Sequence, residues 1–431
     1  MMDTVAGNPT LLVVGGGISG MTAALEAAEA GREVILIERE PALGGRTARL
    51  YRYFPKMCHP TCGLEVNLRR LRANRRVRVL TMAEVTAVQG RAGDYRVSVR
   101  QRPRYVTERC TACGECARAV TARIPNPYNY GLDQMPAAYL PHGLAHPQRY
   151  VLDPSIIGTP EAEQARAACP VGAIDLDMPE RTLELAAGSV IWATGWRPYD
   201  AARIQPYGYG RFKNVITSVE FERLADPAGP TGGRLLRPSD GQPARNIAFI
   251  QCAGSRDENH LRHCSRICCM ATLKQTQYVR AAYPEGDARS TVYYIDIRAI
   301  DRLEDFSARV HADPLVTFIK SKVARIAQDA ASANPVLHGV DTEGYHRYTN
   351  AHDLVVLAIG MQPETEGLQL PEEIVRDSSG FLEGSTSGGQ IAAGAAAAPL
   401  DVNRAVQSAT AAALRGIQVI HRNARAEASH G

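Results

Sequence analysis

Short apolar runs near the N-terminus alternate with polar and glycine-rich segments in a pattern that predicts a βαβ unit. Leu11 to Val14 form a four-residue apolar run, and Val34 to Ile37 form a second one. Between them, the residues Met21 to Ala30 favour a helix, and Gly31 suits its C-terminal cap. The pattern therefore predicts a buried strand, a helix and a second parallel strand.

A Gly-x-Gly-x-x-Gly turn joins the first predicted strand to the helix. The turn and the helix start provide Gly15, Gly17, Ile18, Ser19 and Gly20. The first glycine allows a tight turn, the second allows a pyrophosphate to approach the backbone, and the third allows close helix–strand packing. Glu38 ends the second strand, where its carboxylate would accept hydrogen bonds from ribose hydroxyls. An ordinary glycine-rich turn is the alternative, but the strand, helix and acidic residue together favour a dinucleotide site.

Further glycines along the chain resemble those of the large two-dinucleotide-binding flavoprotein family. A glycine pair follows Glu38, and two later apolar strands, Val190 to Ala193 and Leu354 to Ile359, lead to a glycine with a proline three residues beyond it. A Gly-rich segment before a predicted helix from about Val402 to Gly416 completes the pattern. The resemblance implies FAD, bound also by Arg39, Gly44, Gly45, Arg46, Ala193, Thr194, Gly195, Gly360, Gly394 and Ala395. Ala395 replaces the family's usual acidic residue, so the usual acidic contact to the ribityl chain is in doubt.

Composition narrows the class of protein. The chain has 431 residues, 45% of them apolar and 22% charged, which is typical of globular proteins and excludes a disordered chain. The net charge is 49 − 45 = +4 with scattered arginines, which gives no support to a nucleic-acid partner. No apolar run reaches the ~18 residues that span a bilayer, and the N-terminus lacks a basic leader. We expect a cytoplasmic protein without membrane insertion, in which the ten clustered cysteines are ligands or redox groups.

The first cysteine group lies in a segment, 101–180, that interrupts the flavin domain. Cys110, Cys113 and Cys116 have ferredoxin spacing, and Cys169 is followed by proline. In two-cluster ferredoxins, three cysteines of such a run and a distant Cys-Pro bind one cluster. The second run of such a ferredoxin is missing here, so the four remaining thiols predict one [4Fe–4S] cluster. A zinc site, or cysteines left by a lost cluster, are the alternatives.

The second group stands where a second nucleotide-binding domain would carry its glycine turn. Ile247 to Gln251 and Thr291 to Ile297 are predicted parallel strands, but no glycine motif follows the first. The chain instead carries Cys252, Cys264, Cys268 and Cys269. Two of them, four residues apart, would share one face of a helix whose N-terminus favours thiolates. A second [4Fe–4S] cluster, a redox dithiol and a buried helix without function are the three interpretations, the first being favoured.

The strings around these cysteines resemble the A-type subunit of heterodisulfide reductase. The most specific are Gln251 to Arg256 and Cys264 to Lys274, supported by Asn129 to Asp133 and Pro399 to Val402. The chain is most similar to the short A-like flavoproteins of this family in sulfur-oxidising bacteria. This resemblance implies FAD, one or two [4Fe–4S] clusters, a homodimer, and B-like and C-like heterodisulfide reductase proteins as partners.

Together these observations predict an α/β fold with two dinucleotide-binding domains, similar to thioredoxin and disulfide reductases, and an inserted ferredoxin-like domain. The predicted parts are FAD domain 1–100, insert 101–180, FAD domain 181–240, second Rossmann-like domain 241–350 and FAD domain 351–431. The expected function is electron transfer between flavin and clusters in a heterodisulfide-reductase-like complex of cytoplasmic sulfur oxidation. A pyridine-nucleotide-disulfide oxidoreductase using Cys58 and Cys62 as a dithiol is the first alternative, and a scaffold with relic sites is the second.

Overall fold

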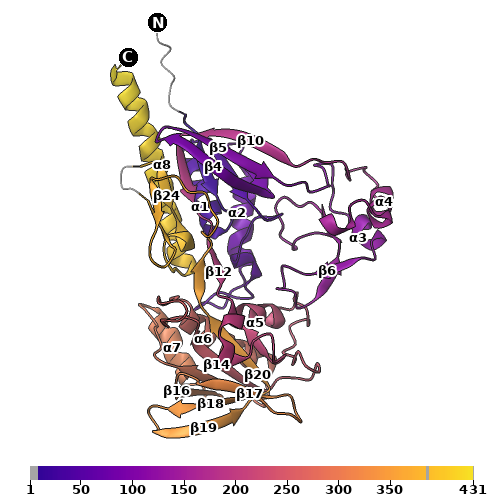
Figure 1. The fold of residues 1–431 in the computed structure, drawn as a ribbon, viewed down its shortest axis with the longest axis vertical. Coiled ribbons are helices and arrows are strands. Elements are labelled where there is room, and N and C mark those ends of the chain that lie inside the picture. Colours follow the sequence, from indigo (N-terminus) through magenta and orange to yellow (C-terminus); the bar gives the residue numbers. More distant parts are fainter. Residues whose placement is uncertain (1–7, 385–387, 431) are drawn as a thin grey trace. The chain divides into compact units, whose positions relative to one another are not determined.

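The computed structural model describes residues 8–384 and 388–430 (Figure 1). Residues 1–7, on which most of the expectation of no leader rests, lie outside the described residues. The chain divides into two compact units, each containing a five-stranded sheet. The first unit comprises Met1–Ala48, Thr61–Trp196 and Pro363–Gly431, and the second comprises Arg49–Pro60 and Arg197–Gln362.

The first unit is built on a parallel sheet. In spatial order its strands are β24 (Gln390–Ala392), β11 (Ser189–Trp192), β1 (Leu11–Val14), β2 (Val34–Glu38) and β3 (Val77–Thr81). The predicted βαβ unit is confirmed, with helix α1 at Ile18–Glu29 and Gly31 in the left-handed region at φ +86°. Because β1 is central, the glycine turn after it lies at the carboxyl edge of the sheet, where such proteins bind ligands.

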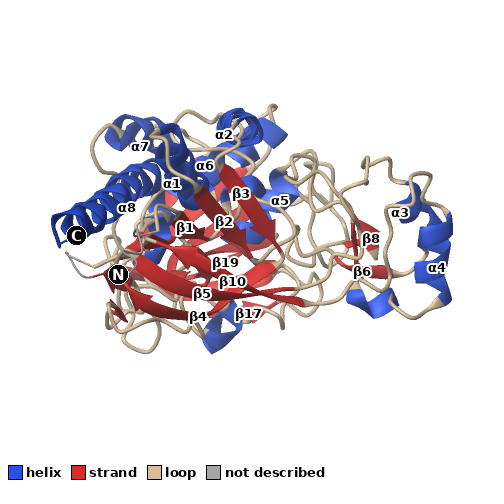
Figure 2. Cartoon of the chain, turned by 90° about the horizontal axis from the view of Figure 1, so that it is seen from above, coloured by secondary structure: helices blue, strands red, loops and turns tan. Residues whose placement is uncertain are grey.

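Both faces of this sheet are covered, which explains why its strands are apolar throughout. Leu11 and Val13 pack with helices α1, α2 (Thr61–Ala73) and α8 (Val402–His430). Leu12 and Val14 face a three-stranded antiparallel sheet. That sheet consists of β10 (Arg181–Ala187), β5 (Asp94–Gln101) and β4 (Ala83–Arg91). Figure 2 shows these helices and this sheet on opposite sides of β1 and β2.

Helix α8 continues well past Gly416, where the sequence predicts its end. Gly416 stays within the helix because it faces the sheet, where an added Cβ would lie 2.5 Å from Leu11 Cδ1. The glycine thus serves close packing rather than helix termination. No helix in the described part of the chain is long and apolar enough to cross a membrane.

The chain between β5 and β10 forms an insert of short elements with an apolar cluster of its own (Figure 1). The elements are α3 (Glu115–Ala119), β6 (Arg123–Pro125), β7 (Gln134–Pro136), β8 (Ala138–Tyr139), β9 (Val151–Leu152) and α4 (Pro160–Ala167). Strand β6 pairs with β7, and β8 pairs with β9, both antiparallel. Cys116 is part of the cluster, so the cysteine loop is anchored in the core of the insert.

The second unit repeats the parallel-sheet plan. Its strands in spatial order are β13 (Val215–Thr217), β20 (Leu354–Ile359), β14 (Asn246–Ala253), β15 (Arg289–Tyr294) and β16 (Val316–Lys320). Its helices are α5 (Ser218–Ala225), α6 (Cys268–Ala282) and α7 (Leu303–His311). A three-stranded antiparallel sheet packs on the face that carries Ala248 and Ile250. Its strands are β17 (Arg325–Gln328), β18 (Pro335–Asp341) and β19 (His346–Ala351).

Short elements complete the described chain. The strands are β12 (Trp196–Pro198), β21 (Met361–Pro363), β22 (Ile374–Arg376) and β23 (Leu382–Gly384). The 3₁₀ turns are η1 (Thr47–Arg49), η2 (Pro154–Ile156), η3 (Ala201–Arg203), η4 (Gln205–Tyr207) and η5 (Gly394–Ala396).

The compact units differ from the predicted domain boundaries in three places. The segment Arg49–Pro60, predicted within the first part of the flavin domain, lies in the second unit. Residues 197–240, predicted within the flavin domain, lie in the second unit with β13 and α5. Residues 351–362 lie there as well, because β20 pairs with β14 on one side and β13 on the other. The predicted strand over residues 291–297 is also shifted, since β15 ends at Tyr294.

Candidate functional site

The turn between β1 and α1 requires glycine at two positions and leaves room at a third. A Cβ added to Gly15 would lie 2.3 Å from the carbonyl oxygen of Ala193. A Cβ added to Gly20 would lie 1.7 Å from the carbonyl oxygen of Gly15. A Cβ added to Gly17 would meet only Gly45 Cα, at 3.9 Å. Gly17 therefore borders open space at the start of α1, where free backbone N–H groups attract phosphate.

Glu38 closes this site from the end of β2. Its carboxylate accepts hydrogen bonds from the Gly16 N–H at 2.7 Å and the Glu40 N–H at 2.8 Å. Burial raises the pKa of Glu38 to about 7, against the lowering effect of those two backbone donors. A buried carboxyl with accepting capacity to spare suits the hydroxyls of a ribose.

Several other predicted flavin contacts gather around the same turn. The Gly44 N–H donates to the Gly16 carbonyl at 2.9 Å. An added Cβ on Gly394 would lie 2.0 Å from Ser19 Oγ, so η5 and α1 touch at this point. The hydroxyl of Thr194 is buried without a hydrogen-bond partner. An open glycine, a carboxylate and an orphaned hydroxyl fit a dinucleotide, and these predicted FAD residues lie around one turn.

The remaining residues predicted to contact the flavin lie in different parts of the chain and have different surroundings. Ile18 is the first residue of α1, Gly195 borders open space, and Ala395 is buried within η5. Arg46 donates to the Trp196 carbonyl at 3.1 Å and lies over the rings of Trp196 and Tyr130. Arg39 pairs with Glu364 at 3.3 Å. Gly360 lies in the second unit, where an added Cβ would approach Ser255 Oγ and Leu261.

The insert brings its four cysteines to one place. The Cys110–Cys116 loop leads into α3, and Cys169 follows α4. Burial, together with the smaller effects of the neighbouring Cys110, Cys113 and Cys169 thiols, raises the pKa of the Cys116 thiol to about 11. Such mutual influence requires that the four sulfur atoms lie near one another.

Backbone N–H groups point at the sulfur atoms of this quartet. The Ala112 N–H donates to Cys110 Sγ at 3.4 Å, and the Ala173 N–H donates to Cys169 Sγ at 3.2 Å. Ala112 has a left-handed backbone at φ +57°. Hydrogen bonds of this kind set the potentials of iron–sulfur clusters. The donor set and its surroundings therefore fit the predicted cluster.

The second quartet lies between β14 and α6, the same place that the glycine turn takes between β1 and α1. Cys252 sits at a register shift of β14 and has a left-handed backbone at φ +55°, a bulge that re-aims its side chain. Cys268 and Cys269 begin α6. Burial raises the pKa of the Cys268 thiol well above its usual value, and the Cys269, Cys252 and Cys264 thiols add to the rise.

One geometric expectation for this quartet is wrong. Cys264 lies in the loop before α6, so it does not share a helical face with Cys268. The loop holds it differently, because the Arg266 N–H donates to Cys264 Sγ at 3.3 Å with Arg266 left-handed at φ +63°. The four thiols of this quartet are therefore brought together by loop residues in strained backbone conformations, which are common at functional sites.

Across the described residues, no three His, Cys, Asp or Glu side chains stand in metal-binding geometry. The thiols of Cys268 and Cys269 instead donate to the carbonyls of Ile359 and Asp296, both at 3.6 Å. Ligand binding would require these buried thiols to lose their protons, so assembly and deprotonation are coupled.

Cys58 and Cys62, the predicted alternative dithiol, are both exposed free thiols. Cys58 belongs to the Arg49–Pro60 segment of the second unit, whereas Cys62 lies in the first turn of α2 in the first unit. Their redox role stays a prediction.

The second unit also contains a buried ion pair that the sequence patterns did not reveal. Lys274 Nζ lies 2.7 Å from Glu222 Oε1, and both side chains are almost fully buried. Gln275 and Tyr278 donate to the same carboxylate. The only sequence signal was a lysine inside the string Cys264 to Lys274, in a chain with few lysines.

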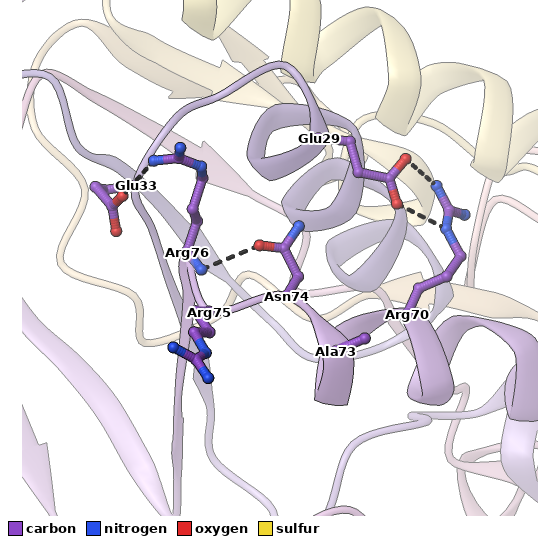
Figure 3. Close-up of a pocket in the computed structure, with 7 residues that line it drawn as sticks. All are labelled: Glu29, Glu33, Arg70, Ala73, Asn74, Arg75 and Arg76. Atoms are coloured by element: carbon purple, nitrogen blue, oxygen red, sulfur yellow. Dashed lines mark hydrogen bonds and ion pairs between the residues drawn. The ribbon is translucent and has the colours of Figure 1, made fainter.

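A surface hollow of about 580 Å³ lies elsewhere (Figure 3). It is lined by Glu29, Glu33, Arg70, Ala73, Asn74, Arg75 and Arg76. Four of its five charged side chains are engaged, because Arg70 pairs with Glu29 at 2.7 Å and Arg76 with Glu33 at 3.0 Å. It borders the C-terminal end of α1, opposite the glycine turn, so it is not part of the dinucleotide site.

The pKa of Glu38 predicts how FAD affinity of the apoprotein depends on pH. Ribose hydroxyls favour the charged carboxylate and would lower its pKa from about 7, so binding releases a proton. We expect affinity to rise as the pH is raised toward 7 and to level off above it. Calorimetric titration in buffers of different ionisation enthalpy measures both effects. A Glu38→Gln protein that keeps the same pH profile would assign it to another group.

Comparisons with known proteins define the class. Residues 10–113 match the family of FAD dependent oxidoreductases. The fold is similar to thioredoxin reductase of T. acidophilum, with a TM-score of 0.52, 12% identity and coverage of 97% of this chain and 99% of that chain. For thioredoxin reductase of Lactococcus lactis, the TM-score is 0.50 and the identity is 13%, with coverage of 97% of this chain and 99% of that chain. The chain therefore has the thioredoxin-reductase-like fold of FAD-dependent oxidoreductases, as predicted.

More similar sequences identify the relatives within that class. The A-type subunit of ferredoxin:CoB-CoM heterodisulfide reductase from Methanosarcina mazei is 36% identical over 95% of this chain and 53% of its own length. The second A-type iron–sulfur subunit of CoB–CoM heterodisulfide reductase from Methanopyrus kandleri is 36% identical over 94% of this chain and 63% of its own length. The chain is thus similar to heterodisulfide reductase A-type subunits over nearly its whole length, and it spans between 53% and 63% of the length of these two relatives.

Proposed function

We propose that this chain is the FAD and iron–sulfur electron-transfer subunit of a heterodisulfide-reductase-like complex. When bound, FAD couples two-electron to one-electron chemistry, and [4Fe–4S] clusters carry single electrons. The observation that carries the proposal is the place of the second quartet. Four thiols lie along the chain from the end of β14 to the start of α6, where a nicotinamide-binding domain would hold the pyrophosphate.

The chain's own residues would divide the work between its two units. The open backbone at Gly17 and the α1 N-terminus would hold the FAD phosphates, while Glu38 would accept from the ribose. Cys110, Cys113, Cys116 and Cys169 would hold one cluster, and Cys252, Cys264, Cys268 and Cys269 a second. Cys113 is exposed, which supports electron exchange with a partner at the surface of the insert.

The partners follow from the relatives rather than from the site. The relatives' names describe them as the A-type subunits of heterodisulfide reductases, which supports an assembly with B-like and C-like heterodisulfide reductase proteins. The sequence resembles A-like flavoproteins of sulfur-oxidising bacteria, so we extend the proposal to a homodimer that works in cytoplasmic sulfur oxidation without nucleic acid or membrane insertion.

Iron and acid-labile sulfide per FAD, measured on anaerobically purified protein, test this proposal. We expect about eight iron atoms per FAD, because each quartet would hold one four-iron cluster. Cys116→Ser and Cys268→Ser should each lower the count to about four, with Cys62→Ser as the exposed control that leaves it unchanged. Iron-free protein that still binds FAD would refute the proposal.

The exposure of Cys58 and Cys62 favours a second candidate, the pyridine-nucleotide-disulfide oxidoreductase. Such an enzyme would be reduced rapidly by NADH or NADPH under anaerobic conditions and would lose disulfide reductase activity when both thiols are replaced by serine. The electron-transfer proposal expects neither nucleotide to bleach the flavin, because no glycine turn follows β14.

A further inference from the structure

Arg104 is a buried cation without an anionic partner. Its exposed fraction is only 6%. Its guanidinium donates to the carbonyls of Arg149 at 3.1 Å and of Pro41, and to Thr81 Oγ1 at 3.0 Å. Within the described chain, no carboxylate forms an ion pair with it. A buried charge is costly unless an opposite charge compensates it, so Arg104 requires a source of negative charge nearby.

Arg104 also stands at the base of the insert quartet. Two residues further on, Val106 bridges Ile174, and the Thr107 N–H donates to the Ala173 carbonyl at 2.7 Å. These contacts join the segments that lead to Cys110 and Cys169. Burial and, less strongly, the neighbouring Arg149 lower the pKa of Arg104 to about 10, whereas Tyr139 and the Cys110 thiol, when charged, oppose that lowering. The guanidinium therefore lies within electrostatic range of the quartet.

Resting on the proposed function, we infer that Arg104 is the counter-cation of the cluster held by Cys110, Cys113, Cys116 and Cys169. Four thiolates make such a cluster anionic, and its reduction adds one more negative charge. A buried cation stabilises the reduced state more than the oxidised state, so Arg104 raises the reduction potential. It acts through the field as a positioning and tuning residue.

Burial distinguishes Arg104 from the other arginines near this quartet. Arg118 pairs with Glu115, and its side chain is 64% exposed. Arg149 is 23% exposed, and it pairs with Glu108, which is 91% exposed. A carboxylate partner or solvent compensates each of these two charges, which leaves Arg104 as the buried arginine without a carboxylate partner. The inference therefore predicts a large effect for one arginine and small effects for its neighbours.

Arg104 joins the insert to the parallel sheet as well. Pro41 and Thr81 lie at the carboxyl ends of β2 and β3, beside the predicted flavin site, whereas Arg149 belongs to the insert. A change of Arg104 thus removes both a charge and a structural link. The two roles separate if the charge is neutralised while the arginine stays in place.

Redox titration of the purified holoprotein, followed by electron paramagnetic resonance, tests the inference. The signal that Cys113→Ser removes is assigned to the insert cluster. At a fixed solution potential, Arg104→Gln should lower the ratio of reduced to oxidised insert cluster about tenfold. For a one-electron couple, this change is equivalent to a reduction potential lower by about 59 mV. Arg104→Lys and the exposed control Arg118→Gln should each change the ratio less than about threefold.

If the Arg104→Gln protein fails to assemble its cluster, a second pair of variants still tests the inference. Thr81→Asp places a carboxylate beside the retained guanidinium and should lower the ratio, whereas the neutral Thr81→Asn should not. An unchanged ratio in Thr81→Asp, or equal shifts in the two Thr81 variants, overturns the inference. Wild-type protein without any signal that depends on Cys113 overturns the proposed insert cluster together with it, whereas a present but unshifted cluster overturns the role of Arg104 alone.

Discussion

The Gly17→Ala protein is expected to fold normally yet bind FAD at least about 100-fold more weakly, a loss of about 2.7 kcal/mol. Gly17 has φ −73°, which alanine adopts without strain, and an added Cβ would meet no protein atom closer than 3.9 Å. The methyl group would instead fill the space that the pyrophosphate needs. FAD content after purification and calorimetric titration of the apoprotein measure the effect.

Gly20→Ala is the matched comparison. Its Cβ would lie 1.7 Å from the Gly15 carbonyl oxygen, so the backbone of the turn would have to move. We expect a destabilisation above about 4 kcal/mol and little soluble protein. Gly31→Ala, at a left-handed position with nothing within 4 Å, should cost only about 1 kcal/mol. Normal FAD binding by Gly17→Ala would show that the phosphates lie elsewhere.

Breaking the buried pair of Lys274 and Glu222 is expected to destabilise the protein by about 3–5 kcal/mol. Lys274 donates to Glu222 and to the Arg52 carbonyl, both at 2.7 Å, and its burial leaves it no access to bulk water in place of either partner. Burial lowers the pKa of Lys274, against the raising effect of Glu222, so removal of the carboxylate would leave the ammonium uncompensated. Lys274→Met and Glu222→Gln should each lower the urea midpoint markedly.

The double variant decides whether the two residues act as a pair. With both charges absent, no unpaired ion is left buried, so Lys274→Met/Glu222→Gln should cost clearly less than the sum of the single changes. The exposed pair of Lys320 and Glu343, at 3.0 Å in the same unit, provides the control and should contribute at most about 1 kcal/mol. Additive costs at Lys274 and Glu222 would mean that each acts independently.

The flavin-site turn was predictable because its determinants are local. The run Leu11 to Val14, the glycines after it and Glu38 lie within one βαβ unit, and each has a conformational or packing reason that spacing alone expresses. The insert quartet was predictable for the same reason, since three of its cysteines lie in one loop, Cys110 to Cys116. Where the pattern is local, the expected element appears within a few residues of its predicted bounds.

Predictions from the sequence were wrong where the same residue pattern is compatible with two local structures. Gly416 resembles a helix end, yet α8 continues because the glycine packs against Leu11. Cys264 and Cys268 have helical spacing, yet α6 begins only at Cys268. In each case a distant partner decided between two locally acceptable conformations.

The sequence by itself determined the fold class, the dinucleotide turn and the two groups of cysteines, because periodicity and spacing carry that information. Only the tertiary structure decided which buried charges have partners. Arg104 and Thr81 are 23 residues apart, and Lys274 and Glu222 are separated by a strand and a long loop. The cost of burying a charge depends on what surrounds it in space, and that arrangement exists only after the chain has folded.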